Sequence, residues 1–168
     1  MATTNPLPLP RMYSSGPNCI PALVKKWGTG SNNFQGPVTK FLHTGAAKIY
    51  GSRFLPATLD NGATVKAIAV CSVETAGTTG QKIRLNLTYA SQASTETADP
   101  AVAQTVSVSQ DVSGWTAKTY RLVEFTLTGS NLAASDLFEY ALERDPTHAD
   151  DNFDNPVYLH ELHLLCNY

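Results

Sequence analysis

The sequence predicts an all-β fold, an antiparallel β-sandwich or jelly roll of about eight strands with an extended, proline-rich N-terminal arm. Three observations support this prediction. Apolar and polar residues alternate over many short runs, as they do in strands that are buried on one face. Turn-forming residues separate these runs at intervals of roughly 10–18 residues. No run of about ten residues combines helical spacing with capping residues.

The size and charge of the chain limit its function. A length of 168 residues suits one domain with a hydrophobic core. Hydrophobic residues make up 42% of the chain, charged residues only 15%, and the formal net charge is −2. Neither nucleic acid nor a membrane is therefore an expected partner. The start of the chain lacks the basic and apolar regions of a Sec-type signal, which predicts synthesis in a cytoplasm.

The first 37 residues are expected to form an extended arm and a covering loop, followed by a β-sandwich domain at residues 38–168. Proline recurs at every second position near the start, fixing φ and removing hydrogen-bond donors. This segment is expected to be extended, either as a free tail or as an arm along a neighbouring subunit. The partner-binding residues of the arm would be Pro6, Leu7, Pro8, Leu9 and Pro10.

Strands are expected from residue 38 onward. The first lies in the run AAKIYGSRF, and a turn follows at Asp60–Gly62. The second lies in TVKAIAVCSV, which is apolar on both faces at its centre, as a strand covered on both sides would be. The third lies in KIRLNLTYA, whose apolar residues share one face. Its other face carries Lys82, Arg84, Asn86 and Thr88, which predicts either exposure or a subunit interface.

Four more strands are expected in the runs AQTVSVSQ, TYRLVEFTLTG, LFEYALER and VYLHELHLLCNY. The last run would place five residues on one face: Tyr158, His160, Leu162, Leu164 and Cys166. His160 and His163 are three positions apart, so on a strand they would point to opposite faces. They are therefore not expected to bind one metal ion, and a zinc-protease motif would need histidines four apart on a helix.

The acidic segment before the last strand is a candidate either for calcium binding or for turn structure. Calcium binds several hard oxygen ligands from flexible loops. The spacing does not match an EF-hand, however, and Asp side chains also fill turns by accepting bonds from local backbone amides. Turn structure, with Arg144 clamping one carboxylate, is the preferred interpretation, and no metal or other cofactor is expected. The calcium alternative would use Asp145, Asp150, Asp151 and Asp154.

No catalytic motif is recognisable in the sequence, so the protein is not expected to be an enzyme. The G-x-S-x-G turn of hydrolases and the phosphate-binding glycine loops are absent. Three widely spaced cysteines form neither a disulfide framework nor a zinc signature. Three aromatic residues, Trp27, Trp115 and Tyr120, are candidates for stacking against a sugar ring, the two tryptophans first among them.

The order of these elements resembles the jelly-roll virion proteins of tailed bacteriophages, which include capsid decoration (cement) proteins, head fibres and distal tail-fibre domains. The resemblance covers roughly residues 38–168 and is a pattern of strands and turns. It rests on the runs AKIYGSRFLP, TVKAIAV, FTLTG and YALERD, the acidic turn, and the closing run VYLHELHLLCNY.

The resemblance implies a non-enzymatic virion structural protein on the capsid surface, synthesised in the cytoplasm of the bacterial host. The main interpretation is a capsid decoration protein, a homotrimer whose N-terminal arm contacts the major capsid protein or other virion proteins. The alternative is a head-fibre or tail-fibre module that recognises host surface glycans. A carbohydrate-binding or adhesion domain of cellular origin is a third interpretation.

Overall fold

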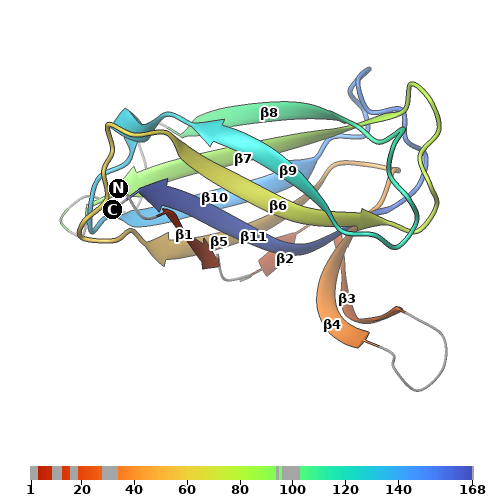
Figure 1. Ribbon diagram of the computed structural model, residues 1–168, viewed down its shortest axis with the longest axis horizontal. Coiled ribbons are helices and arrows are strands. Elements are labelled where there is room, and N and C mark those ends of the chain that lie inside the picture. Colours follow the sequence, from red (N-terminus) through yellow and green to blue (C-terminus); the bar gives the residue numbers. More distant parts are fainter. Residues whose placement is uncertain are drawn as a thin grey trace.

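The computed structural model describes residues 4–8, 13–15, 19–27, 34–93, 95 and 103–167, with side chains between residues 38 and 166. Within these residues the chain forms eleven strands, and η1 (Gly129–Asn131) is a single turn of 3-10 helix. The predicted all-β sandwich is confirmed (Figure 1). Nothing in this described part is a helix long and apolar enough to cross a membrane.

Two antiparallel sheets face each other. Sheet A contains, in spatial order, β3 (Cys19–Trp27), β4 (Phe34–Phe41), β11 (Val157–Asn167), β6 (Val65–Val73) and β9 (Arg121–Leu127), and β1 (Thr4–Pro8) pairs with the end of β11. Sheet B contains β2 (Tyr13–Ser15), β5 (Ala47–Phe54), β10 (Leu137–Arg144), β7 (Lys82–Gln92) and β8 (Gln104–Asp111).

The hydrophobic core lies between the inner faces of the two sheets. In β7 the predicted alternation is confirmed, because Ile83, Leu85 and Leu87 are fully buried. Strand β6 contributes small core side chains at every second position, while Ile68 and Val70 on its outer face stay partly exposed. The apolar centre of β6 had predicted burial on both faces, but only the inner face is fully buried. Burial of each large apolar side chain stabilises the fold by about 1.5–3 kcal/mol.

A β-bulge in β11 changes which of its residues face the core. Leu159 pairs with Cys71 and Glu161 with Val70, so His160 is one extra residue in the strand. The prediction of a single face from Tyr158 to Cys166 is therefore wrong. After the bulge the predicted residues do face the core, but before it the inner positions belong to Val157 and Leu159.

The bulge also places both histidines of β11 on the outer side of sheet A. His160 Nε2 lies 2.7 Å from Ser72 Oγ, and His163 pairs with Ile68 on the outer face of β6. The prediction that the two side chains point to opposite faces is therefore wrong. His163 Nε2 lies 2.7 Å from Glu161 Oε2, so each histidine has a separate partner.

The N-terminal segment contributes strands to both sheets. Strand β1 runs antiparallel along the end of β11, with Thr4 opposite Asn167 and Pro8 opposite His163. The backbone is extended as predicted, but its described neighbour is this chain's own last strand. Pro6 and Pro8 are two positions apart, so their missing donors fall on one edge of the strand. Leu9 and Pro10 lie outside the described residues, and binding of this segment to another subunit stays a prediction.

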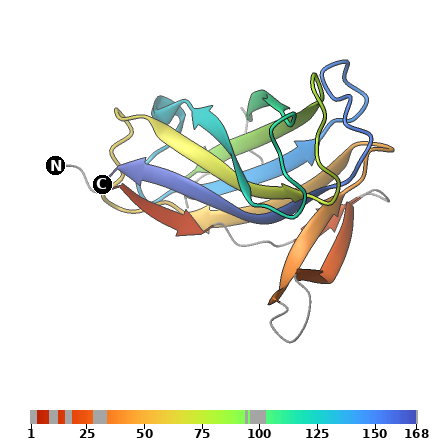
Figure 2. The same ribbon diagram turned by 45° about the vertical axis from the view of Figure 1, so that its right-hand side comes forward.

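The segment that was expected to be a covering loop contains β3 and β4 instead. These strands pair as a hairpin that extends away from the sandwich (Figures 1 and 2). Strand β3 is the edge of sheet A, where a proline such as Pro21 is tolerated because the free side of an edge strand needs no donor. The division of the chain at residue 37 stays a prediction.

Candidate functional site

A hollow of about 360 Å³ lies on the outer face of sheet B, over β5, β10 and β7. Its lining includes the small side chains of Ala90 and Ala141. One wall is the ring of Tyr50, whose side chain is 41% exposed. The residues that shape the hollow include Tyr50, Ser52, Thr88, Ala90, Glu139 and Ala141.

Strand register brings these side chains into neighbouring rows. Ser52 lies opposite Glu139, and Glu139 lies opposite Ala90. In the next row, Tyr50 lies opposite Ala141. Directly opposed Cβ atoms are about 4.5–5.5 Å apart, so one small ligand can contact an aromatic ring, a hydroxyl and a carboxylate at once.

Three polar groups around the hollow, those of Tyr50, Ser52 and Glu139, lack a partner in the described part of the chain, whereas Thr88 pairs with Thr105. Within the described part of the chain, the hydroxyls of Tyr50 and Ser52 and the carboxylate of Glu139 have no hydrogen bond or ion pair. Phe54, two positions beyond Ser52 on the same face of β5, is 65% exposed. Exposed aromatic rings beside a few convergent, unpaired polar groups are typical of a ligand-binding surface.

The cation next to the hollow is already paired. Lys48 Nζ lies 3.0 Å from Glu143 Oε2, on the same face of sheet B as Tyr50. The hydrogen bond with Glu143 raises the pKa of Lys48. Lys48 therefore stays charged in the neutral range, and Glu143 neutralises it.

Polar side chains on β7 and β8 pair with each other across the strands. Thr88 Oγ1 lies 3.0 Å from Thr105 Oγ1, and Ser107 Oγ donates to Asn86 Oδ1 at 2.8 Å. Arg84 Nη1 donates to Ser109 Oγ at 2.8 Å. The polar face predicted for β7 thus lies outward, and a ladder of hydrogen bonds satisfies much of it.

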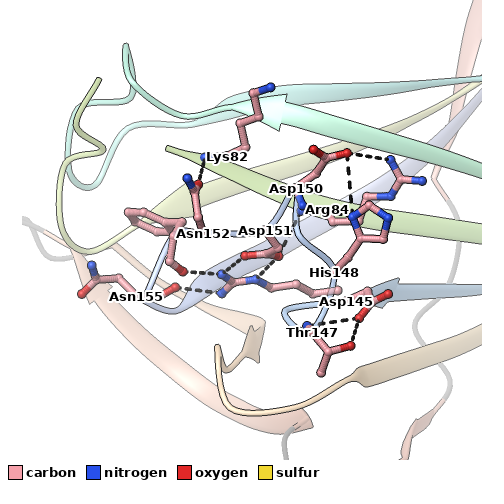
Figure 3. Close-up of polar contacts among 11 residues, drawn as sticks. Lys82, Arg84, Asp145, Thr147, His148, Asp150, Asp151, Asn152 and Asn155 are labelled. Carbon is pink, nitrogen blue, oxygen red and sulfur yellow. Dashed lines mark hydrogen bonds and ion pairs between the residues drawn. The ribbon is translucent and has the colours of Figure 1, made fainter. Parts of the chain in front are cut away.

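The acidic segment forms a clasp around one buried arginine (Figure 3). Arg144 donates from Nε to Asp151 Oδ2 at 2.9 Å and from Nη2 to Asp151 Oδ1 at 2.7 Å. Arg144 also donates to the backbone carbonyls of Phe153 and Asn155. Both charged side chains are buried, 0% and 1% exposed. The predicted clamp of Arg144 on one carboxylate is confirmed.

The remaining carboxylates of this segment have other positions (Figure 3). Asp145 accepts hydrogen bonds from the backbone and hydroxyl of Thr147. Asp150 accepts a bond from Ser109 at 3.2 Å, and Asp154 is exposed. The four calcium candidates therefore do not converge. No group of three or more His, Cys, Asp or Glu residues in the described part of the chain is arranged to bind a metal ion.

The two tryptophan candidates have different outcomes. Trp115 is only 6% exposed and belongs to the hydrophobic core, so the prediction that its ring stacks against sugar is wrong. Its turn folds inward because the Trp115 backbone N–H donates to the Val112 carbonyl and both side chains pack in the core. The side chain of Trp27 lies outside the described side chains. The exposed aromatics that sequence reasoning missed on sheet B are Tyr50 and Phe54, although their alternation with Ser52 signals a shared outer face.

The outer face of sheet A carries a different pair of exposed apolar residues. Tyr120 is 56% exposed and Leu122 is 58% exposed at the β9 edge. The Tyr120 ring meets the His160 ring edge to face, with 4.7 Å between centroids.

No protein-family model and no curated protein sequence matches the chain. Among solved structures, the xylan-binding module CBM15 is similar with a TM-score of 0.53 and 10% identity, over 98% of this chain and 97% of that one. TmCBM61 in complex with β-1,4-galactotriose has a TM-score of 0.43 at 12% identity, over 90% and 86%. A family 11 carbohydrate-binding module from Clostridium thermocellum, in complex with a β-1,3-1,4-mixed-linked tetrasaccharide, has a TM-score of 0.42 at 11% identity, over 90% and 85%. The first similarity shows that the β-sandwich fold is shared over nearly the whole chain.

Proposed function

We propose that this protein is a glycan-binding β-sandwich whose ligand occupies the hollow on the outer face of sheet B. The observation that carries the proposal is the exposed Tyr50 ring beside the unpaired Ser52 hydroxyl and Glu139 carboxylate. A sugar ring has an apolar C–H face and a rim of hydroxyls, so it needs an aromatic surface and hydrogen-bond partners together. The fold shared with a module named for xylan binding also supports the proposal.

We propose binding without catalysis. Hydrolysis of a glycosidic bond usually needs two carboxyl groups about 5–9.5 Å apart. Glu143 is the next carboxylate of β10 on this face, four positions beyond Glu139, which is about 13 Å along a strand. Glu143 is also engaged by Lys48. Among the described residues of the hollow, Glu139 is the one available carboxylate, which suits hydrogen bonding to a ligand better than bond cleavage.

The biological setting that we put forward is a fibre module of a bacteriophage virion that recognises host surface glycans. The proposed glycan site fits this role better than it fits decoration of a capsid. Capsid binding through the N-terminal segment, a trimeric state and a place on the virion stay predictions. Deleting residues 1–12 and measuring the occupancy of capsids would test that decoration role separately.

The test of glycan binding compares two exposed tyrosines. Wild-type protein, Tyr50→Ala and Tyr120→Ala would be screened against neutral and acidic polysaccharides by affinity electrophoresis, followed by titration calorimetry. We expect Tyr50→Ala to weaken retention by about tenfold or more, which corresponds to about 1.4 kcal/mol. Tyr120→Ala, a matched change on sheet A, should bind like the wild type. Binding that survives Tyr50→Ala unchanged, or that is lost equally in both variants, would exclude the hollow as the site.

A further inference from the structure

We infer that the ligand is an uncharged oligosaccharide that lies along β5, and that Glu139 is the residue that excludes acidic sugars. This inference rests on the proposed function, because it specifies the class of glycan for the same hollow. It follows from the charges on the outer face of sheet B and from the spacing of the exposed rings on β5.

Among the described residues, the charges on this face leave the Glu139 carboxylate without a counter-ion. Lys48 is paired with Glu143 at 3.0 Å, and Arg84 Nη1 lies 3.9 Å from Asp150 Oδ2. A third cation, Lys82, lies opposite Asp111. Hydrogen bonds from Ser113 lower the pKa of the Asp111 carboxyl most, and the charge of Lys82 lowers it further. Glu139 is the remaining carboxylate, and it has no ion pair within the described part of the chain.

An unpaired carboxylate favours hydroxyl donors and disfavours a second anion. Its two oxygens accept hydrogen bonds from two sugar hydroxyls, and such charge-assisted bonds are stronger than those between neutral groups. A uronate or sialate carboxylate in the same hollow would be repelled by Glu139. In the described part of the chain no unpaired cation beside it would compensate, because Lys48 is held by Glu143.

The exposed rings on β5 indicate the length of the ligand. Tyr50 and Phe54 share the outer face and are four positions apart, a separation of about 13 Å along a strand. This distance is longer than one pyranose ring. Ser52 lies midway between the rings and directly opposite Glu139. A sugar chain running along β5 can therefore contact both rings and present hydroxyls to Ser52 and Glu139 between them.

The experiment measures binding of neutral hexasaccharides of xylose, glucose, mannose and galactose, and of hexagalacturonate, by calorimetry. The proteins are the wild type, Tyr50→Ala, Glu139→Gln and Glu143→Gln. We expect the wild type to bind at least one neutral hexasaccharide at least tenfold more tightly than hexagalacturonate. Glu139→Gln should reduce this preference about tenfold, because the amide keeps the shape of the carboxylate and loses its charge.

Glu143→Gln is the matched control on the same strand. It leaves the hollow intact and releases Lys48, so neutral binding should stay within about twofold while hexagalacturonate binding strengthens. Binding of hexagalacturonate that depends on Tyr50 but is unchanged in Glu139→Gln would overturn this inference and leave the proposed function standing. If no glycan of this panel or of the polysaccharide screen binds in a Tyr50-dependent way, the proposed function fails and this inference fails with it.

Discussion

The outer face of sheet B has two halves that both carry polar side chains and differ in their hydrogen bonding. On β7 and β8, Thr, Ser, Asn and Arg side chains bond to one another across the strands. On β5 and β10, the hydroxyls of Tyr50 and Ser52 and the carboxylate of Glu139 have no such partners in the described part of the chain. We call these the paired half (β7–β8) and the open half (β5–β10).

We infer from this difference that the pairing of polar side chains, and not their polarity, distinguishes the half that would bind a ligand from the half that would not. Polar groups that already bond to each other have little to gain from a ligand, because binding would only exchange one hydrogen bond for another. Unpaired groups beside an exposed ring keep their capacity for a ligand. The acidic segment strengthens the paired half further, since Asp151 and Asn152 accept bonds from the backbone of Arg84 and Lys82.

The largest expected effect comes from breaking the clasp at the end of the paired half. Arg144→Met should lower the free energy of unfolding by about 3–5 kcal/mol, because it leaves the Asp151 carboxylate buried and unpaired. Urea denaturation measures the change. The control is Lys48→Met, which removes an exposed ion pair and should cost less than about 1 kcal/mol. Equal losses in the two variants would show that burial does not distinguish the two ion pairs.

A second prediction concerns alkaline pH, which should destabilise the core beneath both halves equally. Burial raises the pKa of Cys71 to about 12, whereas an unfolded thiol titrates near 9. Above pH 9 the unfolded chain releases this proton and the folded chain keeps it, so stability present below pH 9 is lost as pH rises towards 12. Between pH 8 and pH 10, the free energy of unfolding of the wild type should fall by about 1 kcal/mol more than that of Cys71→Ala, as measured by urea denaturation. Parallel losses in the two proteins would contradict this account.

A third prediction breaks one pair of the paired half. Ser107→Ala removes the donor to Asn86 and should lower the free energy of unfolding by up to about 1 kcal/mol. Glycan affinity should stay at the wild-type value, since this pair lies outside the residues that shape the hollow. Denaturation and calorimetry on the same preparation measure both quantities. A loss of affinity here would mean that the ligand extends over the paired half.

The smallest expected effect comes from a serine-to-alanine substitution on the open half. Ser52→Ala removes a hydroxyl that bonds to nothing in the described chain, so stability should change by less than about 0.5 kcal/mol. Glycan affinity should fall about threefold, close to 0.7 kcal/mol. Ser52→Ala and Ser107→Ala thus form a matched pair with opposite outcomes. The comparison between the halves fails if both variants change stability and affinity to the same extent.

Local patterns in the sequence predicted the features that depend on neighbouring residues. The alternation in β7 predicted its buried face, and the position of Arg144 beside four aspartates predicted the clamp. The bulge at His160 could not be predicted in this way, because one extra residue leaves the composition of the strand unchanged and reverses the faces before it. Trp115 was misassigned since a turn sequence does not show whether its ring packs inward.

The open half depends on pairing between distant segments. Tyr50 and Ser52 alternate in the sequence, but whether their hydroxyls find partners is decided by the register of β5 on β10. Nothing local to Glu139 indicates that Ser52 and Ala90 flank it. Unsatisfied polar groups can therefore be recognised only after the strands are aligned.

The pairing of β1 with the end of β11 has an engineering consequence. Thr4 lies opposite Asn167, so the first and last described strands meet at one end of the sandwich. Opposed Cα atoms in antiparallel strands are about 4.5–5.5 Å apart, a gap that a short flexible linker can span. A circularly permuted chain, with these ends joined and new ends opened in the turn at Asp60–Gly62, should keep both sheets intact. Such a permutant would carry a fluorescent or solid-phase tag in that turn, which closely follows β5 in the sequence.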